Sequence, residues 1–414
     1  MNVQSFFGFC LFAGIAWCFS ERRRLFPLRI VLIGMGMQII LGVVLLRFSL
    51  VRSGFLYLNR AVMALEAATH AGTAFVFGFV GGGTAPYEIA YPQASFILAF
   101  QTMPLVLVIS ALSAILFHWG ILQKIVKGFS WVLEKTLRIG GAEGLGVSVN
   151  IFVGMVEAPL LVGPYVRHMT RSELFTLMTS GMATIAGTVM VLYASILDPV
   201  IPNVIGHILI ASIISAPAAI VVAKIMVPET SPLTAGELAA PETASGTMDA
   251  ITRGTEQGLS LLLNIIAMII VLVALVHLVN AIMTGVLPLS GGEPITLQRV
   301  LGWLMSPVVW LMGIPWGEAP TAGALMGTKT ILNELIAYLD LRNLPEGALS
   351  ERSRLIMTYA LCGFANPGSL GIMIAGMGGI APDRRGDIVS LGLRSVVAGT
   401  LATCMTGSVV GMLT

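Results

Sequence analysis

The sequence predicts an all-α membrane protein with about eight transmembrane helices. Its 414 residues are 56% hydrophobic and 11% charged, and its mean hydropathy is +0.90, values far too apolar for a soluble globular chain. Near-continuous apolar stretches recur at close to the roughly 20 residues that a spanning helix needs. We expect spans at about 3–19, 28–46, 94–117, 173–197, 204–227, 259–287, 355–380 and 388–413.

Two further segments are less suited to crossing a bilayer. The segment 299–315 is short, begins at Arg299 and contains Pro307, so we expect an interfacial or partly inserted helix. Residues 61–92 are rich in glycine and only patchily apolar. They predict a surface-lying helix followed by a loop.

The distribution of charge predicts the orientation. Three arginines, Arg22 to Arg24, follow the first apolar segment rather than precede it, the reverse of a secretory signal, so this segment is expected to remain as a helix. Basic loops favour the cytoplasmic side. The N-terminus is then outside, and an even number of spans returns the C-terminus to the same face.

Several classes of function are disfavoured by what the sequence holds. A formal net charge of +2 is too small to suggest a nucleic-acid partner, and there is no nucleotide-binding loop, HExxH or GxSxG motif. The five histidines have no metal-ligand spacing. The chain is therefore expected not to be an enzyme, to need no cofactor, and to drive any uphill transport with an ion gradient. The four cysteines fall within predicted spans without CxxC pairing and are expected to be packing residues: Cys10, Cys18, Cys362 and Cys404.

The chain also contains a weak internal repeat on either side of a polar linker, 228–258. In the first half, an apolar stretch with Asn150, Glu157 and Pro159 precedes SGMATIAGTVM, which begins at Ser180. In the second half, a stretch with paired prolines and carboxylates precedes CGFANPGSLGI, which begins at Cys362. Paired interrupted segments of this kind are typical of transporters that bind substrate between two repeats.

Glu157 is the most informative polar residue of the first repeat. A charged side chain at the bilayer centre costs about 2.5–3.5 kcal/mol on insertion scales. Pro159, two residues later, favours a re-entrant hairpin, which is tolerated only where it is buried in protein or lines a water-filled cavity. Segment 316–338 repeats this pattern with Lys329 and Glu334.

Each of these groups has a simpler interpretation as well. Glu318 and Lys329 are also compatible with a membrane surface, and Glu157 or Glu334 with a structural ion pair. A set of six polar groups in two repeats favours a shared ligand site instead: Asn150, Glu157, Asn333, Glu334, Asn366 and Ser369.

A sodium site is suggested by hard oxygen donors at the interrupted segments. These are Asn150, the Thr184 hydroxyl and the backbone carbonyls near Val153 and Ile185. Unwound backbone of this kind coordinates sodium in transporters. Ordinary hydrogen bonding within the helix bundle is the alternative, and spacing alone leaves both open.

The second hairpin carries the decisive motif. Gly327, Lys329, Asn333, Glu334 and the pair Ala337-Tyr338 match the signature G-x-K-x-x-x-N-E-F-x-A-Y, with leucine in place of phenylalanine. The chain thereby resembles the concentrative nucleoside transporters. Further stretches that match this family in order are AFQTMPLVLVISALSAILFHWGILQ, NIFVGMVEAPLLV, CGFANPGSLGI and APDRRGDI.

The resemblance implies a homotrimer in the bacterial inner membrane, in which a scaffold holds a moving transport domain built from two inverted repeats. Each repeat would contain a re-entrant hairpin and a broken helix. Import would be nucleoside symport with sodium, or with protons in some members. The expected parts are scaffold and interfacial helices at 1–140, the first repeat at 141–228, the linker at 229–258, a scaffold span and interfacial helix at 259–315, and the second repeat at 316–414.

The resemblance also assigns roles to residues. Ribose contacts would be Glu334, Asn366 and Ser369, and the sodium ligands would be Asn150, Val153, Thr184 and Ile185. The base would lie against Phe364, Val189 and the first hairpin, Gly154-Met155-Val156-Glu157. Many relatives have Gln-Thr where this chain has Met155-Val156, so we expect either a broadened base preference or a related ligand with a different ring. A passive channel and an intramembrane hydrolase are the alternatives from other classes.

Overall fold

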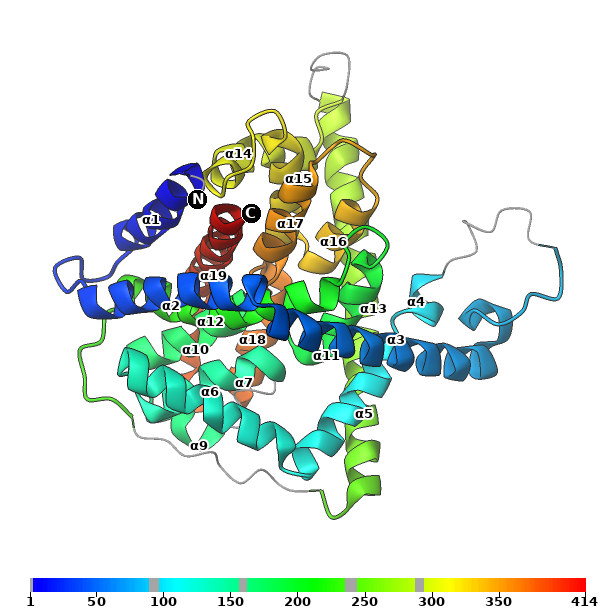
Figure 1. Ribbon diagram of the computed structural model, residues 1–414, viewed down its shortest axis with the longest axis horizontal. Coiled ribbons are helices and arrows are strands. Elements are labelled where there is room, and N and C mark those ends of the chain that lie inside the picture. The colour runs from blue at the N-terminus through cyan, green and yellow to red at the C-terminus, as the bar shows by residue number, and fades with distance from the viewer. Residues whose placement is uncertain (1–2, 89–96, 156–161, 235–243, 287–293) are drawn as a thin grey trace.

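The computed structural model describes residues 3–88, 97–155, 162–234, 244–286 and 294–414 (Figure 1). Every regular element within these ranges is helical, which confirms the predicted all-α class. Seven helical segments among the described residues are long and apolar enough to cross a membrane: Leu28–Arg47, Arg60–Gly81, Leu98–His118, Arg171–Leu197, Val204–Met226, Thr247–Val286 and Pro382–Leu413.

The helices before the first repeat form two groups. Helices α1 (Val3–Cys18) and α2 (Leu28–Arg47) pack on two helices that come later in the chain, α12 (Val204–Met226) and α19 (Arg385–Leu413). Helix α3 (Ser49–Phe77) contacts α2, α12 and α5, with the short α4 (Leu98–Gln101) nearby. Helix α5 (Leu105–His118) packs along α13, and α6 (Ile121–Leu137) packs on α7 (Gly141–Phe152).

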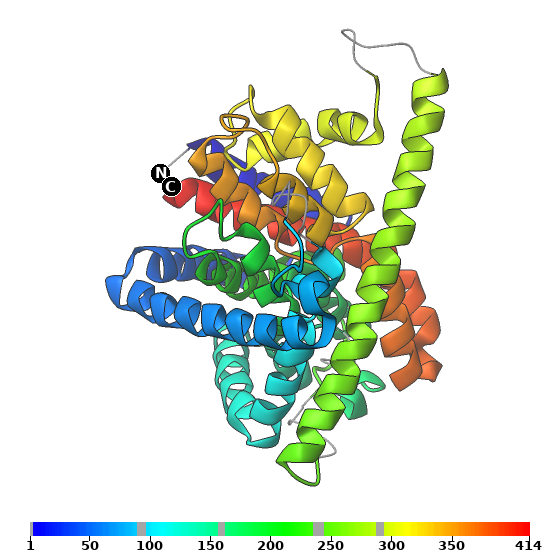
Figure 2. The ribbon, with the colours of Figure 1, turned by 90° about the vertical axis from the view of Figure 1, so that its right-hand side faces the viewer.

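Helix α13 (Thr247–Val286) stands along one edge of the molecule and extends past the other helices at both ends (Figure 2). Its 40 residues correspond to about 60 Å, twice the thickness of a hydrocarbon core. Only 11% of its most apolar window is buried, against 83% for α19. Most of the apolar surface of α13 is therefore not covered by the rest of the described chain.

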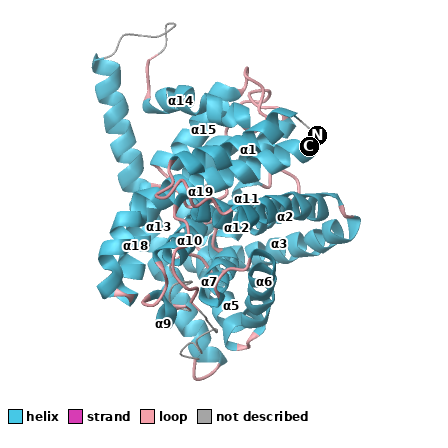
Figure 3. Cartoon of the chain, turned by 90° about the vertical axis from the view of Figure 1, so that its left-hand side faces the viewer, coloured by secondary structure: helices cyan, strands magenta, loops and turns pink. Residues whose placement is uncertain are grey.

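Helix α19 is the central packing element. It contacts α1, α2, α10, α12, α17 and α18. The two termini lie close together in all three views (Figure 1, Figure 2 and Figure 3), and near them Arg47 donates to the carbonyl of Leu413 at 3.0 Å. The outward orientation of both termini remains a prediction.

Two of the predicted spans are interrupted at their centres. The span predicted at 173–197 consists of α10 (Arg171–Ala183) and α11 (Gly187–Leu197), and that at 355–380 consists of α17 (Glu351–Leu361) and α18 (Pro367–Ile380). We call residues 184–186 the first break and residues 362–366 the second break. The breaks meet, since a Cβ on Gly363 would lie 2.8 Å from the Met182 carbonyl oxygen.

The elements before the second break form a compact unit. Helix α14 (Leu297–Leu311) packs on α15 (Ala319–Ile331), which is separated by Leu332 and Asn333 from α16 (Glu334–Arg342). A Cβ on Gly323 would lie 2.4 Å from the Gly302 carbonyl oxygen. Small residues therefore allow α14 and α15 the close approach that is common between membrane helices. The corresponding unit of the first half has α7 and α9 (Gly163–Val166) on either side of residues 156–161.

Two boundaries differ from the sequence prediction. Helix α13 begins at Thr247 rather than at 259, within the segment expected to be linker, because Asp249 accepts hydrogen bonds from Ser245 N and Arg253 and so stabilises a polar first turn. Helix α3 begins at Ser49, before the surface helix expected from residue 61, and together with the following 3-10 turn it forms the spanning candidate Arg60–Gly81. Prediction from apolar runs misses polar helical extensions of this kind.

We predict that Gly399→Ala destabilises the protein. The added Cβ would lie 2.5 Å from Met182 Cβ, beside the first break, and overpacking of this kind costs about 1–3 kcal/mol. Thermal unfolding in detergent should show a lower midpoint. The matched control on α19 is Gly386→Ala, where no atom lies within 4 Å of the added Cβ; an equal midpoint for both variants would contradict the packing described here.

Candidate functional site

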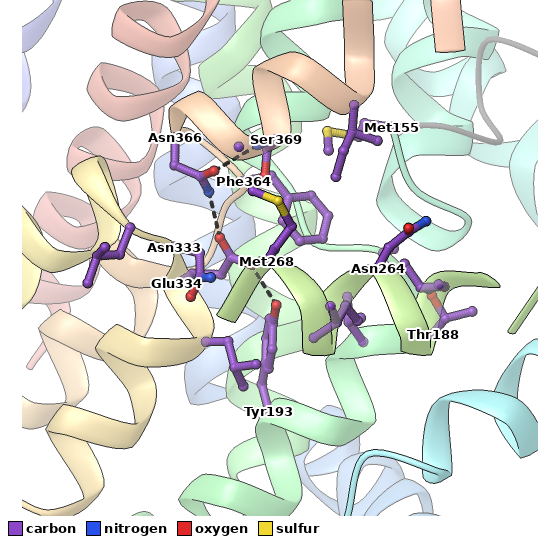
Figure 4. A pocket seen from close by; sticks show the side chains of 18 of the residues that line it. Met155, Thr188, Tyr193, Asn264, Met268, Asn333, Glu334, Phe364, Asn366 and Ser369 are labelled. Carbon is purple, nitrogen blue, oxygen red and sulfur yellow. Dashed lines mark hydrogen bonds between the residues drawn. The ribbon is translucent and has the colours of Figure 1, made fainter. Parts of the chain in front are cut away.

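A cavity of about 330 Å³ lies where the two breaks face α13. Its walls come from α11, α13, α16, α18 and the segments before them, and Figure 4 shows the side chains that point into it. The cavity brings together groups from both halves of the chain. The residues predicted from the sequence that line it are Met155, Val189, Asn333, Glu334, Phe364, Asn366 and Ser369.

Glu334 is fixed at the wall of this cavity by two side chains. Tyr193 Oη donates to one carboxyl oxygen at 2.6 Å, and Asn366 Nδ2 donates to the other at 3.0 Å. Glu334 is 4% exposed and occupies the first turn of α16, where the positive end of the helix dipole favours a carboxylate. Each carboxyl oxygen retains a further lone pair that a ligand hydroxyl can use.

Two helices begin at the cavity with an asparagine cap. Asn333 Oδ1 accepts a hydrogen bond from Ile336 N at 2.9 Å, and Asn366 Oδ1 accepts one from Ser369 N at 2.8 Å. Asparagine is among the preferred N-cap residues because its side-chain oxygen satisfies a free amide of the first turn. Capping therefore fixes the Asn366 side chain so that its amide nitrogen points at Glu334.

Lys329 does not line the cavity but contacts the helix end that precedes the second break. Its Nζ donates to the Ala360 carbonyl and to Thr403 Oγ1, both at 2.8 Å. Ala360 is in the last turn of α17, where free carbonyls attract a cation. Because Lys329 is fully buried, the alternative that placed it at a membrane surface is wrong.

The remaining cavity wall is mainly apolar. Met155, Val189 and Phe364 contribute to it, together with Met268 from α13. Met155 and Asn264 lie away from Glu334 and Asn366 in Figure 4. The cavity thus has a polar side that carries a carboxyl group and an apolar side that suits a flat ring.

The expected sodium ligands gather at the first break. Thr184 Oγ1 is 3.1 Å from the Asn150 carbonyl oxygen and 2.9 Å from the Ser180 carbonyl oxygen. Asn150 Nδ2 donates to the Leu177 carbonyl at 3.2 Å, while no group in the described part of the chain donates to Asn150 Oδ1. A fully buried amide oxygen without a donor is a fitting ligand for a hard cation.

The backbone supports the same chemistry. Helix α7 ends at Phe152 with Val153 as its C-cap, and α10 ends next to Ile185. A Cβ on Gly187 would lie 2.4 Å from the Phe152 carbonyl oxygen, so only glycine lets the end of α7 approach the first break this closely. Two helix C-termini with their partial negative charge therefore meet here, and such ends coordinate sodium in transporters.

Comparisons with known proteins agree along the whole chain. Family models described as "Na+ dependent nucleoside transporter N-terminus", "Nucleoside recognition" and "Na+ dependent nucleoside transporter C-terminus" match residues 7–80, 99–200 and 207–411. The chain is 36% identical to the uncharacterized transporter YutK of Bacillus subtilis, with both chains fully covered. It is 31% identical to the nucleoside permease NupC of Helicobacter pylori, covering 99% of this chain and 97% of the permease.

The chain belongs to the concentrative nucleoside transporter family. A solved structure of CNTnw in an inward-facing substrate-bound state is 33% identical and superposes with a TM-score of 0.89, covering 100% of this chain and 98% of that one. Human solute carrier family 28 member 3 is 34% identical over the whole of this chain, which spans 60% of that longer protein. Membership agrees with the resemblance found in the second-hairpin motif.

Several lining residues of this nucleoside transporter family member were not predicted. Tyr193 and Thr188 lie on α11, and Gln257, Ser260 and Asn264 lie on α13. Gln257 was overlooked because it lies in the segment assigned to the linker. Ser260 and Asn264 were overlooked because they lie in a segment assigned as an apolar span. Their spacing of i, i+3 and i+7, which places them on one helix face, is the signal that would have found them.

Only two of the four residues assigned to the first hairpin are among the described residues. Val156 and Glu157 lie outside the described residues. Gly154 is buried with φ of +118°, a conformation that favours glycine, and does not line the cavity. Of the expected hairpin contacts, Met155 alone is a described residue that lines the cavity.

We predict that Tyr193→Phe weakens nucleoside binding by about tenfold or more. The variant removes only the hydroxyl that donates to Glu334, and a hydrogen bond to a charged group is worth about 1.5–3 kcal/mol. Binding to the purified protein, measured by calorimetry, would test this. In the control Tyr338→Phe, the lost hydroxyl bonds the Thr358 carbonyl and does not line the cavity, so affinity should change little; equal losses in both variants would argue against a direct role for Tyr193.

Proposed function

We propose that this protein is a secondary active symporter of the bacterial inner membrane. It would import nucleosides by coupling their uptake to the movement of sodium down its gradient. The observation that carries this proposal is the Glu334 carboxyl group, which Tyr193 and Asn366 hold at the cavity wall. A carboxylate beside an amide suits the vicinal hydroxyls of ribose, with Ser369 as a third contact. A buried site built for hydroxyl groups rejects ligands that lack them.

The sodium proposal rests on the first break. Asn150 and Thr184, with the carbonyls of Val153 and Ile185, would hold the ion, which would supply the driving force for uptake. The orphaned Asn150 oxygen and the two converging helix C-termini support this assignment. Proton coupling is the alternative, and it would use a carboxyl group of the site in place of these oxygens.

The base side of the site supports an unusual preference. Met155 is 7% exposed and offers a thioether where many relatives offer an amide, and Val156 offers no hydrogen bond. A neutral hydrogen bond contributes about 0.5–1.5 kcal/mol. We infer either a broad selection of bases through apolar contact with Phe364 and Val189, or a nucleoside-like ligand with a different ring.

Alternating access would come from movement of the breaks and hairpins relative to α13. Structures similar to this chain include CNTnw variants in an outward-facing state and in intermediate states. In the proposed homotrimer, the exposed apolar surface of α13 would be covered by lipid and neighbouring subunits. Proteoliposomes distinguish the two rival functions, because a passive channel equilibrates a nucleoside without concentrating it and a hydrolase yields free base.

We predict that Glu334→Gln abolishes most nucleoside uptake. The amide replaces one acceptor oxygen with a donor, so it cannot accept from Tyr193, Asn366 and a sugar hydroxyl as the carboxyl does. Uptake of labelled uridine and adenosine into proteoliposomes would measure the loss, with 2′- and 3′-deoxy analogues as poor substrates of the unmodified protein. The conservative surface variant Glu346→Gln serves as the control, and uptake that survives Glu334→Gln would remove the ribose assignment.

We predict that replacement of sodium by choline at fixed pH abolishes concentrative uptake, and that Thr184→Val has the same effect. Thr184→Ser retains the hydroxyl and should keep sodium-dependent uptake. The measurement is the sodium concentration that gives half-maximal uptake for each variant. Undiminished uptake in choline would reject sodium coupling, and uptake that then follows an imposed pH gradient would favour protons.

A further inference from the structure

Helix α13 carries a row of polar side chains that lies outside the motifs found in the sequence. Gln257, Ser260 and Asn264 line the cavity from one face of this helix, at the point where its polar first turns give way to its apolar part. Polar side chains within membrane segments are costly unless they face a partner or an aqueous cavity. We call these three residues the α13 polar row.

The α13 polar row differs from other polar residues of the same helix. Thr252, Thr255 and Thr284 each donate to a carbonyl four residues earlier, at 3.0, 2.8 and 2.7 Å. Asn280 bonds Gln298 and the amide of Leu297. Among the described residues, no hydrogen bond is formed by the side chain of Asn264, which points into the cavity with its donors and acceptor unused.

The position of Asn264 determines which end of a ligand it meets. Figure 4 places it on the side of Met155 and away from Glu334 and Asn366. A nucleoside held by its sugar at Glu334 would direct its heterocycle toward Asn264. The amide supplies one acceptor and two donors, which suits the polar edge of a nucleobase.

We propose that Asn264 is a specificity-determining residue that hydrogen-bonds the exocyclic edge of the base. This inference rests on the proposed nucleoside function and deepens it. It assigns to α13 the polar base contact that Met155 cannot make. Ser260 and Gln257 continue the row over about 10 Å of the helix, so they offer further hydrogen bonds when the site moves along α13.

The test compares ligands that differ only at the base edge. Adenosine is paired with purine riboside, which lacks the 6-amino group, and cytidine with zebularine, which lacks the 4-amino group. The pair to use is the one whose natural nucleoside, adenosine or cytidine, binds the unmodified protein more tightly. The unmodified protein should bind that nucleoside about 2- to 10-fold more tightly than its analogue, the range of one neutral hydrogen bond. In Asn264→Leu, the ratio should fall close to one, through weaker binding of the nucleoside and not of the analogue.

Two further variants control the test. Asn264→Gln retains the amide and should restore part of the preference, and Thr255→Val on the same helix removes a hydroxyl that is bonded within α13, so it should leave the ratio unchanged. An unaltered ratio in folded Asn264→Leu would overturn the role of Asn264 while leaving nucleoside transport intact. If no nucleoside binds the unmodified protein, the proposed function itself fails.

Discussion

The structure depends on one constraint: a helix interrupted inside a bilayer frees backbone amides and carbonyls that lipid cannot satisfy. This chain interrupts two helices and places both breaks against each other, packed on α19. The freed groups then have distinct surroundings. Helix starts with asparagine caps face the cavity beside Glu334, whereas the ends of α7 and α10 face the first break.

Each break places the end of one helix near the start of another: α10 ends and α11 begins at the first break, and α17 ends and α18 begins at the second. The starts of α16 and α18 favour a carboxylate and polar ligand groups, and the two converging C-termini favour a cation. Lys329 satisfies the end of α17, so that helix end has its own internal cation. The proposed substrate site and the proposed ion site would then lie close together without sharing ligands, and both would depend on the same pair of breaks.

Much of this could be predicted from the sequence. The length of the apolar runs predicted the helices. The paired stretches at Thr184 and Asn366, with the motif around Glu334, predicted the breaks, because glycine, proline and asparagine stand out in apolar segments. Seven residues singled out from the sequence line one cavity. Tyr193 was missed because a single polar residue in an apolar helix has no local pattern, and its role arises only from the tertiary neighbours that face it. Asn264 was missed because Gln257, the first residue of its i, i+3, i+7 row, was assigned to the linker.

The boundary of α13 and the arrangement of α1 and α2 show the same limit. Hydropathy marks where a chain is apolar, yet the first turns of α13 are polar and stabilised by Asp249. The sequence grouped α1 and α2 with the predicted scaffold, whereas in space they pack on α12 and α19. Packing partners of this kind depend on surfaces distant in sequence, so which helices move together remains a prediction.

The most direct test of the central claim is an experimental structure determined with a bound nucleoside and sodium. The account predicts ligand density between the two breaks and α13, with sugar hydroxyls within hydrogen-bond distance of the Glu334 carboxyl, and an ion beside Asn150 and Thr184. Density elsewhere in the protein, or a ligand whose sugar does not touch Glu334, would contradict it.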